Sequence, residues 1–144
     1  MSYSTDVNIL LYASDKDCRF HDKARAFLES SAAGSEVFCL GWPTIMAYLR
    51  ISTHPSIFAS PQSPQEAAEN IERLLSLPQA RTIAEVEGFW ETYREVTQAV
   101  VARGNLVPDA HLAALLKQHG VRTLYTNNAG FRQFPFLRVK NPLA

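Results

Sequence analysis

The sequence predicts one α/β domain in which helices cover both faces of a central, mainly parallel sheet. Short β-like segments alternate with segments of helical periodicity, the order expected of a parallel sheet between two helical layers. A length of 144 residues is typical of one domain, and 47% hydrophobic residues suffice for a buried core. No repeat or linker divides the chain, so residues 1–144 are expected to form a single domain.

Short β-like segments lie between the helical ones. They are Met1 to Thr5, Glu36 to Leu40, Arg81 to Ile83, Arg122 to Thr126 and Leu137 to Val139. In parallel sheets of this kind, ligands bind beyond the carboxyl ends of the strands. The residues that follow each strand are therefore where a functional site is expected.

Helices are predicted from apolar residues that recur at helical spacing. The expected ranges are residues 21–33, Phe89 to Gly104, and Pro108 to Gly120. Glycine near the ends of these segments fits the backbone conformation that commonly terminates a helix. A helix over Val7 to Ala13, with Asp6 as its N-cap, is also compatible with the sequence.

The segment before residue 64 carries the clearest local signal. Ser63 and Glu66 have the spacing of a capping box, and Pro64 stands at the first helical position. Apolar residues then recur at helical spacing up to Pro78. The sequence therefore predicts a helix over about residues 64–77.

Composition excludes several classes of protein. Lys plus Arg number 14 and Asp plus Glu number 14, and a formal charge of zero argues against a nucleic-acid footprint over the whole surface. No apolar run approaches the roughly 20 residues that cross a bilayer, and the amino terminus has no secretory signal pattern. Cys18 and Cys39 form no paired motif. A cytoplasmic protein without a membrane segment is expected.

The charges are unevenly distributed along the chain. Beyond Asp109 there is no acidic side chain, and the basic residues are Lys117, Arg122, Arg132, Arg138 and Lys140. Solvated surface positions explain such a bias unless the residues surround a site for an anion.

Polar residues at the predicted strand ends form a candidate site. Asp6 and Asn8 follow the first strand, Thr126 and Asn128 follow the strand that begins at Arg122, and Asp109 lies in the first turn of a helix. Two carboxylates with neutral oxygen ligands suit Mg²⁺ or Mn²⁺. The alternative is structural: Asp6 as an N-cap, and Asp109 as a complement to a helix dipole.

Other catalytic motifs are absent. The sequence has no paired histidine spacing for zinc, no glycine-rich phosphate loop and no G-x-S-x-G turn.

Four segments occur in an order that matches a known family. They are Thr5 to Leu11, Trp42 to Pro55, Leu106 to Leu115 and Leu124 to Phe131, the last followed by Phe134-Pro135 and Asn141-Pro142. On these segments the chain resembles the PIN-domain ribonucleases, specifically the VapC-like toxins of type II toxin–antitoxin modules. The resemblance implies a three-layer PIN-like fold and hydrolysis of RNA with Mg²⁺ or Mn²⁺. It also implies a homodimer and a cognate antitoxin whose C-terminal segment occupies the active groove.

The resemblance also implies roles for individual residues. Asp6 and Asp109 would hold the metal, Asn128 would complete its surroundings, and Thr126 and Asn8 would orient water and the carboxylates. The candidates for contact with RNA are Arg132, Arg138, Tyr12 and Phe131. Arginine contacts to phosphates position an RNA strand without reading its sequence.

The chain also departs from the family pattern at its acidic positions. The family usually has an acidic residue on the helix after the second strand, where Ile45, Met46 and Ala47 stand here. It usually has Asp at the position of Asn128, and often a second Asp at the position of Gly130. Fewer carboxylates imply weaker affinity for a divalent cation and lower activity.

Several explanations of these departures stay open at the level of sequence. The enzyme works with fewer carboxylates, or the chain is an inactive RNA- or antitoxin-binding module, or Asn128 is an introduced replacement of Asp. A haloacid-dehalogenase-like phosphatase would also place an Asp after the first strand. It would normally have a second Asp at the position of Asn8, so this alternative is weaker.

Overall fold

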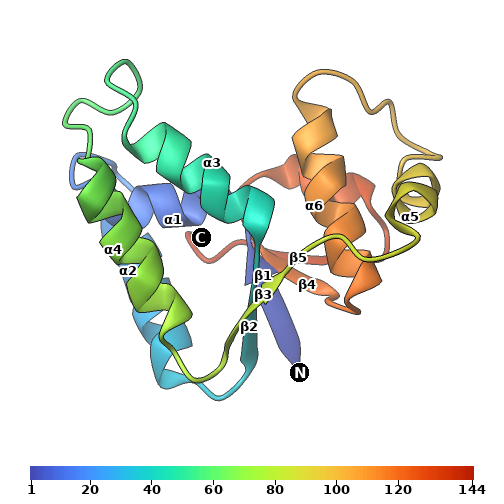
Figure 1. Cartoon of the computed structure of the whole chain (residues 1–144), viewed down its shortest axis with the longest axis horizontal. Helices are drawn as coiled ribbons and strands as arrows, with labels where there is room; N and C mark the ends of the chain where they lie inside the picture. Colours follow the sequence, from blue (N-terminus) through green and yellow to red (C-terminus); the bar gives the residue numbers. More distant parts are fainter.

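Five parallel strands form the central sheet of the computed structural model, which describes residues 1–144 (Figure 1). The strands are β1 (Ser2–Thr5), β2 (Val37–Gly41), β3 (Ala80–Ile83), β4 (Thr123–Tyr125) and β5 (Arg138–Lys140). Their order across the sheet is β3-β2-β1-β4-β5, and every neighbouring pair is parallel. The predicted strands are confirmed, with small shifts at their ends.

Helices cover both faces of this sheet. They are α1 (Val7–Ser14), α2 (His21–Ala33), α3 (Trp42–Ser52), α4 (Pro64–Leu75), α5 (Phe89–Val96) and α6 (Leu106–Gln118), with a short 3₁₀ helix η1 (Ala129–Gln133) before β5. Figure 1 shows α1 to α4 on one side of the sheet and α5 and α6 on the other. The three-layer α/β architecture is therefore confirmed. None of the helices is long and apolar enough to cross a membrane.

Successive side chains along each strand point to opposite faces of the sheet, and the interior therefore has two main hydrophobic cores. On β2, Phe38 and Leu40 pack in one core with Tyr48 of α3. Cys39, which points to the opposite face, packs in the other core with Leu115 of α6. Strands that are buried on both faces in this way are typical of parallel sheets.

β1 is the central strand, and this position determines which residues meet at the edge of the sheet. Ser4 of β1 pairs with Cys39 of β2 and with Leu124 of β4. Because the strands are parallel, their carboxyl ends share one edge. Asp6 after β1 and Thr126 after β4 are consequently neighbours, and the backbone N–H of Asp6 donates to the carbonyl of Tyr125 at 3.4 Å.

The capping box before α4 is confirmed. The Ser63 hydroxyl accepts from the backbone N–H of Glu66 at 3.1 Å, and the Glu66 carboxylate accepts from the backbone N–H of Ser63 at 3.2 Å. These reciprocal bonds pair two backbone donors that the first helical turn leaves free. The helix ends at Leu75, slightly before the predicted boundary.

The predicted boundaries of the last two α-helices were wrong. α5 ends at Val96, far short of Gly104, and the Thr97 hydroxyl donates to the carbonyl of Tyr93 at 2.8 Å where the helix stops. α6 begins at Leu106, so that Pro108 is its third residue. Proline is tolerated there because the first backbone N–H groups of a helix have no partner within it.

Candidate active site

Asp6 is a buried carboxylate at the carboxyl edge of the sheet. It stands between β1 and α1 and is only 5% exposed. One oxygen, Oδ2, accepts a hydrogen bond of 2.6 Å from the hydroxyl of Thr126. The other oxygen, Oδ1, is buried and has no hydrogen-bond partner. An unpaired buried carboxylate oxygen is costly, and such atoms commonly mark a functional site.

Burial raises the pKa of Asp6 to about 6, because desolvation disfavours the charged form. The Thr126 hydroxyl and the backbone N–H groups of Ile9 and Asn8 oppose this shift, whereas the negative charge of Asp109 adds to it. A cation beside Asp6 would therefore stabilise its charged form and lower its pKa.

Asp109 faces the same cavity from α6. It lies in the first turn of that helix, and burial raises its pKa. A cavity of about 180 Å³ is lined by Asp6, Asn8, Asp109 and Asn128, among others. The structure thus brings together both predicted carboxylates and both predicted asparagines. Thr126, 1% exposed, does not line this cavity and acts on it through its hydrogen bond to Asp6.

The side chain of Asn128 is held by hydrogen bonds at both ends. Its Oδ1 accepts from the backbone N–H of Gly130 at 2.9 Å, and its Nδ2 donates to Oδ2 of Asp109 at 3.4 Å. Because only the oxygen can accept from Gly130, the NH₂ group faces Asp109. In this orientation Asn128 offers the carboxylate a donor rather than offering a cation a ligand.

Gly130 leaves the room that this arrangement needs. A Cβ atom at this position would lie 3.0 Å from Oδ1 of Asn128. A side chain at position 130 would therefore crowd Oδ1 of Asn128 in its present orientation.

A hydrogen-bonded chain joins the two carboxylates. The backbone N–H of Asn128 donates to Oγ1 of Thr126 at 2.9 Å, and the same hydroxyl donates to Asp6. The Asn128 side chain completes the path to Asp109. Thr126 thus orients Asp6, and Asn128 orients Asp109. In metal sites, residues that hydrogen-bond to the ligands have the same role.

The position of the missing acidic residue is Ala47. Within the window expected from the sequence, Ile45 is 1% exposed in the core and Met46 is 52% exposed, whereas Ala47 lines the cavity. A carboxylate at Ala47 would face Asp6 and Asp109, so its absence removes charge from the cavity itself.

His111 is a cavity residue that the sequence analysis did not identify. It lines the cavity, and its Nε2 pairs with the carboxylate of Glu85 at 2.5 Å. His111 lies two residues after Asp109, and residues two apart on a helix do not share a face. The spacing in the sequence therefore did not indicate that His111 faces the same cavity as Asp109.

The cavity suits a divalent cation. It holds two carboxylates whose pKa values are both raised, and one of them has an unpaired buried oxygen. No cluster of three or more His, Cys, Asp or Glu residues is present. Hard cations such as Mg²⁺ keep several waters and are often bound through one or two carboxylates. Asp6 and Asp109 are therefore the candidate protein ligands for such a cation.

The four candidates for RNA contact lie in different environments. Phe131 is 1% exposed within a hydrophobic core, so it presents no surface to RNA and its prediction does not fit the structure. Tyr12 is half-buried, packs on Phe20, and accepts a long hydrogen bond from Asn127. Arg132 is exposed and lines a small cavity that includes Asn128. Arg138 is exposed at the amino end of β5, away from the catalytic edge.

Comparison with known proteins identifies the family. Residues 3–137 match the PIN domain family. The chain is 42% identical over 144 residues to Ribonuclease VapC48 of Mycobacterium tuberculosis, covering 100% of this chain and 99% of that protein. It is 35% identical over 138 residues to VapC ribonuclease Mb2897 of Mycobacterium bovis, covering 96% and 93% of the two chains.

Structural comparison agrees on the fold. A chain in the crystal structure of VapBC2 from Rickettsia felis, bound to a DNA fragment from its promoter, superposes with a TM-score of 0.70. The two chains are 21% identical, and the match covers 98% of each. The chain therefore belongs to the PIN-domain family, within its branch of VapC ribonucleases.

Proposed function

We propose that this chain is a metal-dependent endoribonuclease that acts as the toxin of a toxin–antitoxin module. Its similarity to VapC ribonucleases over the whole chain supports this function. The observation that carries the proposal is the pair of carboxylates, Asp6 and Asp109, in one cavity, with an unpaired buried oxygen on Asp6. This donor set is suited to hydrolysis of a phosphodiester bond.

Asp6 and Asp109 are the residues that would hold Mg²⁺ or Mn²⁺. When bound, the ion would orient a water molecule for attack on phosphorus and offset the charge of the phosphate. Thr126 fixes the rotamer of Asp6 through its 2.6 Å hydrogen bond, and Asn128 fixes that of Asp109. Asn8 lines the cavity, where its amide is suited to orienting the water or the RNA.

Arg132 is the basic residue best placed to contact the RNA backbone near the scissile bond. It is exposed and lines a small cavity of about 70 Å³ that shares Asn128 with the catalytic site. A guanidinium group binds phosphate oxygens bidentately, so Arg132 would hold the strand on the side of η1.

The partners follow from the same proposal. A toxin of this kind requires a cognate antitoxin, and we propose that a C-terminal antitoxin segment occupies the cavity between Asp6 and Asp109. We also propose that the chain forms a homodimer and acts in the cytoplasm, where its RNA substrate would be found.

The proposed test is cleavage of defined RNAs by antitoxin-free protein with Mg²⁺, Mn²⁺ or EDTA. Cleavage is expected with either metal and should stop in EDTA. Asp6→Ala should abolish cleavage while the protein remains folded by thermal unfolding, because the substitution removes a ligand and a buried charge. Retained cleavage in Asp6→Ala would remove this residue from the mechanism.

A second candidate is a binding module that keeps the fold without the chemistry. Ala47 and Asn128 favour it, because both replace carboxylates that the family pattern leads one to expect in the cavity. If neither the wild type nor Asn128→Asp cuts any RNA in a broad panel, while the wild type still binds RNA or the antitoxin, this second function is correct.

A further inference from the structure

Four basic side chains lie along the edge strand β5. This strand is the last in the sheet, so one of its sides pairs with β4 and the other side is free. Arg138 and Lys140 lie on β5 itself, and Arg132 lies in η1, which precedes it. Arg122 stands just before β4, where its carbonyl accepts from the backbone N–H of Arg138. The four cations therefore follow one edge of the sheet, which we call the β5 edge.

The charges of the β5 edge are not neutralised within the protein. All four side chains are exposed, and none of them forms an ion pair. Beyond Asp109 the chain has no acidic side chain at all. The ammonium group of Lys140 lies 5.9 Å from the centre of the Tyr125 ring, a contact that leaves its charge in place. The β5 edge therefore has an excess of positive charge, which attracts a polyanion.

A small cavity of about 70 Å³ joins the β5 edge to the candidate active site. Arg132, Val139 and Asn141 line it together with Asn128. Asn128 also lines the cavity that holds the two carboxylates. The two cavities are therefore neighbours at the carboxyl edge of the sheet.

Several hydrogen-bond donors at the small cavity have no partner. Oδ1 of Asn141 accepts from the backbone N–H of Leu143 at 2.9 Å, so its NH₂ group is left for another partner, and the guanidinium of Arg132 can only donate. Arg138 and Lys140 bond to the β4 side, so the backbone N–H of Val139, between them, faces the free side of the sheet. Donors of this kind suit phosphate, whose oxygens only accept.

The other sides of the candidate active site are less suited to a polyanion. On the α3 side, the exposed side chains next to the cavity are the apolar Trp42 and Met46. On the α5 side, Glu85, Glu87 and Glu91 are exposed acidic residues. Negative charge repels a phosphate backbone, so the β5 edge is the favoured direction.

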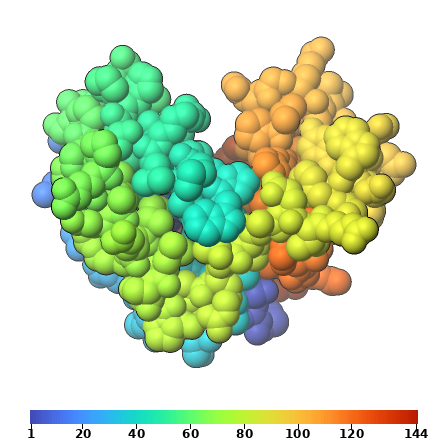
Figure 2. Space-filling view, viewed as in Figure 1, coloured from blue at the N-terminus to red at the C-terminus, as the bar shows by residue number.

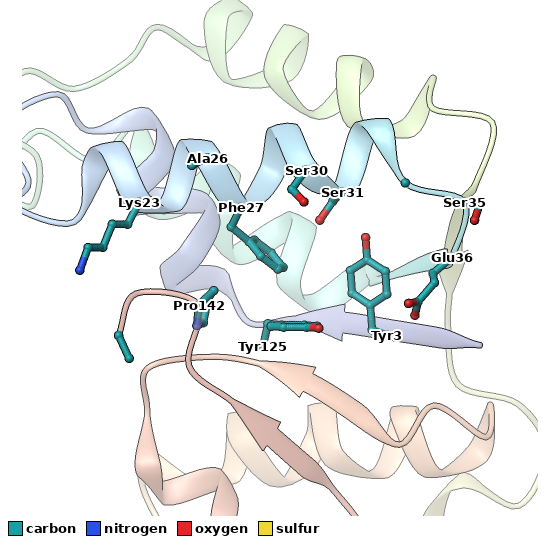
Figure 3. A pocket seen from close by; sticks show the side chains of 12 residues that line it. Tyr3, Lys23, Ala26, Phe27, Ser30, Ser31, Ser35, Glu36, Tyr125 and Pro142 are labelled. Carbon is teal, nitrogen blue, oxygen red and sulfur yellow. The ribbon is translucent and has the colours of Figure 1, made fainter.

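The largest cavity of the molecule, about 780 Å³, lies along α2 and has no such excess of charge (Figure 3). Its charged side chains are Lys23 and Glu36, which Figure 3 shows at opposite ends. Lys23 already donates to the carbonyl of Leu143 at 3.1 Å. Charge, and not cavity size, therefore distinguishes the β5 edge as a surface for nucleic acid.

We propose that the RNA substrate runs from the candidate active site through the small cavity and along the β5 edge, with phosphates bound by Arg132, Lys140 and Arg138. Residues two apart on a strand are separated by about 7 Å, a spacing similar to that of adjacent phosphates in an extended single strand. The substrate class is therefore an RNA with an unpaired segment on this side of the scissile bond. Phosphate contacts read no sequence, so this segment has no required base. The inference rests on the proposed ribonuclease function.

The test is equilibrium binding of a short single-stranded RNA in EDTA, so that no cleavage occurs, at a series of salt concentrations. Each phosphate contact contributes about 0.7 to the slope of log affinity against log salt for a single strand. Arg132→Gln and Lys140→Gln are each expected to reduce the slope by about this amount and to weaken binding at least about threefold.

Arg73→Gln is the matched control. Arg73 is an exposed cation without an ion pair on α4, which packs beside β3 at the opposite edge of the sheet. The control should keep the affinity and the slope of the wild type. Equal losses in all three variants would overturn the inference, because they would report net charge alone. Unchanged slopes in Arg132→Gln and Lys140→Gln, or no binding of RNA by the wild type, would overturn it too.

A second set of probes tests direct contact. Each probe carries one neutral methylphosphonate linkage, at a different position along the same oligonucleotide. At the position that Arg132 binds, the neutral linkage should weaken binding by the wild type but not by Arg132→Gln, in which that contact is already lost. Equal effects on both proteins at every position would exclude the contact.

Cleavage of the RNA with Mn²⁺, measured in parallel, separates this inference from the function on which it rests. Metal-dependent cleavage with the same KM in the wild type, Arg132→Gln and Lys140→Gln leaves the ribonuclease function intact and removes the β5 edge from the binding surface. Absence of cleavage, together with salt slopes that depend on Arg132 and Lys140, removes the ribonuclease function and keeps the β5 edge as an RNA-binding surface.

Discussion

Asn128 places a hydrogen-bond donor in the candidate active-site cavity, at a position where the family pattern usually has the charge of Asp. Its amide lies 3.4 Å from the Asp109 carboxylate and stabilises the charged form of that group without a cation. An Asp at the same position would keep the bond from Gly130 and place its second oxygen beside Asp109. We therefore expect the site with Asn to be more stable when empty, and to bind a cation less strongly, than a site with Asp.

Asn128→Asp is expected to raise the affinity for Mn²⁺ by about tenfold or more, because a third carboxylate joins the site. Calorimetric titration with Mn²⁺ measures this change. Asn127→Asp is the matched control. It adds the same charge at the preceding residue, whose side chain donates a hydrogen bond to Tyr12. Equal gains in the two variants would mean that the effect is long-range charge and not a new ligand.

The raised pKa of Asp6 predicts how stability depends on pH in the absence of metal. Since the native pKa is about 6 and the usual value is 3.8, the folded protein binds more protons than the unfolded chain between these values. The free energy of unfolding should therefore fall as the pH rises from 4 to 6 and stay low above it. The loss at pH 7 is up to about 3 kcal/mol.

Urea unfolding in EDTA at a series of pH values measures this dependence. Asp6→Asn removes the titrating group and keeps an oxygen that accepts from Thr126, so it should flatten the pH dependence and stabilise the metal-free protein at pH 7. A wild-type protein that grows more stable between pH 4 and pH 7 would contradict the assignment to Asp6.

Among the helices, α4 depends most clearly on a local signal. The Ser63 hydroxyl pairs with the first turn, so Ser63→Ala is expected to cost about 1 kcal/mol in the free energy of unfolding. Urea unfolding measures the loss. Ser60→Ala in the preceding exposed loop is the control and should change stability little. Losses of the same size in both variants would mean that the cap contributes nothing specific.

α5 and α6 show the limit of reading helices from apolar spacing. Val100 and Val101 continue the apolar pattern of α5 but lie outside the helix, and Val101 is 69% exposed. Pro108 suggested a start, yet the helix begins before it. Periodicity reports which face of a helix is buried, whereas the ends depend on local hydrogen bonds and on tertiary contacts.

The whole molecule exposes several large apolar side chains on α3 and α5. Trp42 is 41% exposed, Met46 52% and Trp90 62%. Trp90 stacks on Tyr93 at 5.7 Å between ring centroids. Figure 2 shows the yellow segment that contains α5 on the outer surface of the molecule. Exposed apolar groups of this size are typical of protein interfaces.

The proposed homodimer should therefore depend on this surface. Trp90→Lys is expected to shift the protein from dimer to monomer, because a charge replaces the largest exposed aromatic group of α5. Light scattering coupled to size-exclusion chromatography measures the mass. Thr92→Lys, at another position on the same helix, is the control. A wild type that is already monomeric, or a Trp90→Lys variant that stays dimeric, would exclude this face from the interface.

Local sequence was sufficient for the strands, for the start of α4 and for the residue types of the candidate site, but not for the ends of α5 and α6 or for the helix α3. The strands, the capping box at Ser63 and the candidates Asp6 and Asp109 follow from patterns within a few residues, where short-range sterics and hydrogen bonds dominate. The sequence could not tell that Phe131 is buried, that His111 faces the cavity or that the NH₂ group of Asn128 faces Asp109. Those facts depend on the strand order, which places Thr126 beside Asp6 across 120 residues of chain. Only the packed sheet brings such distant groups together, because their contact is a long-range consequence of burying both faces of β1.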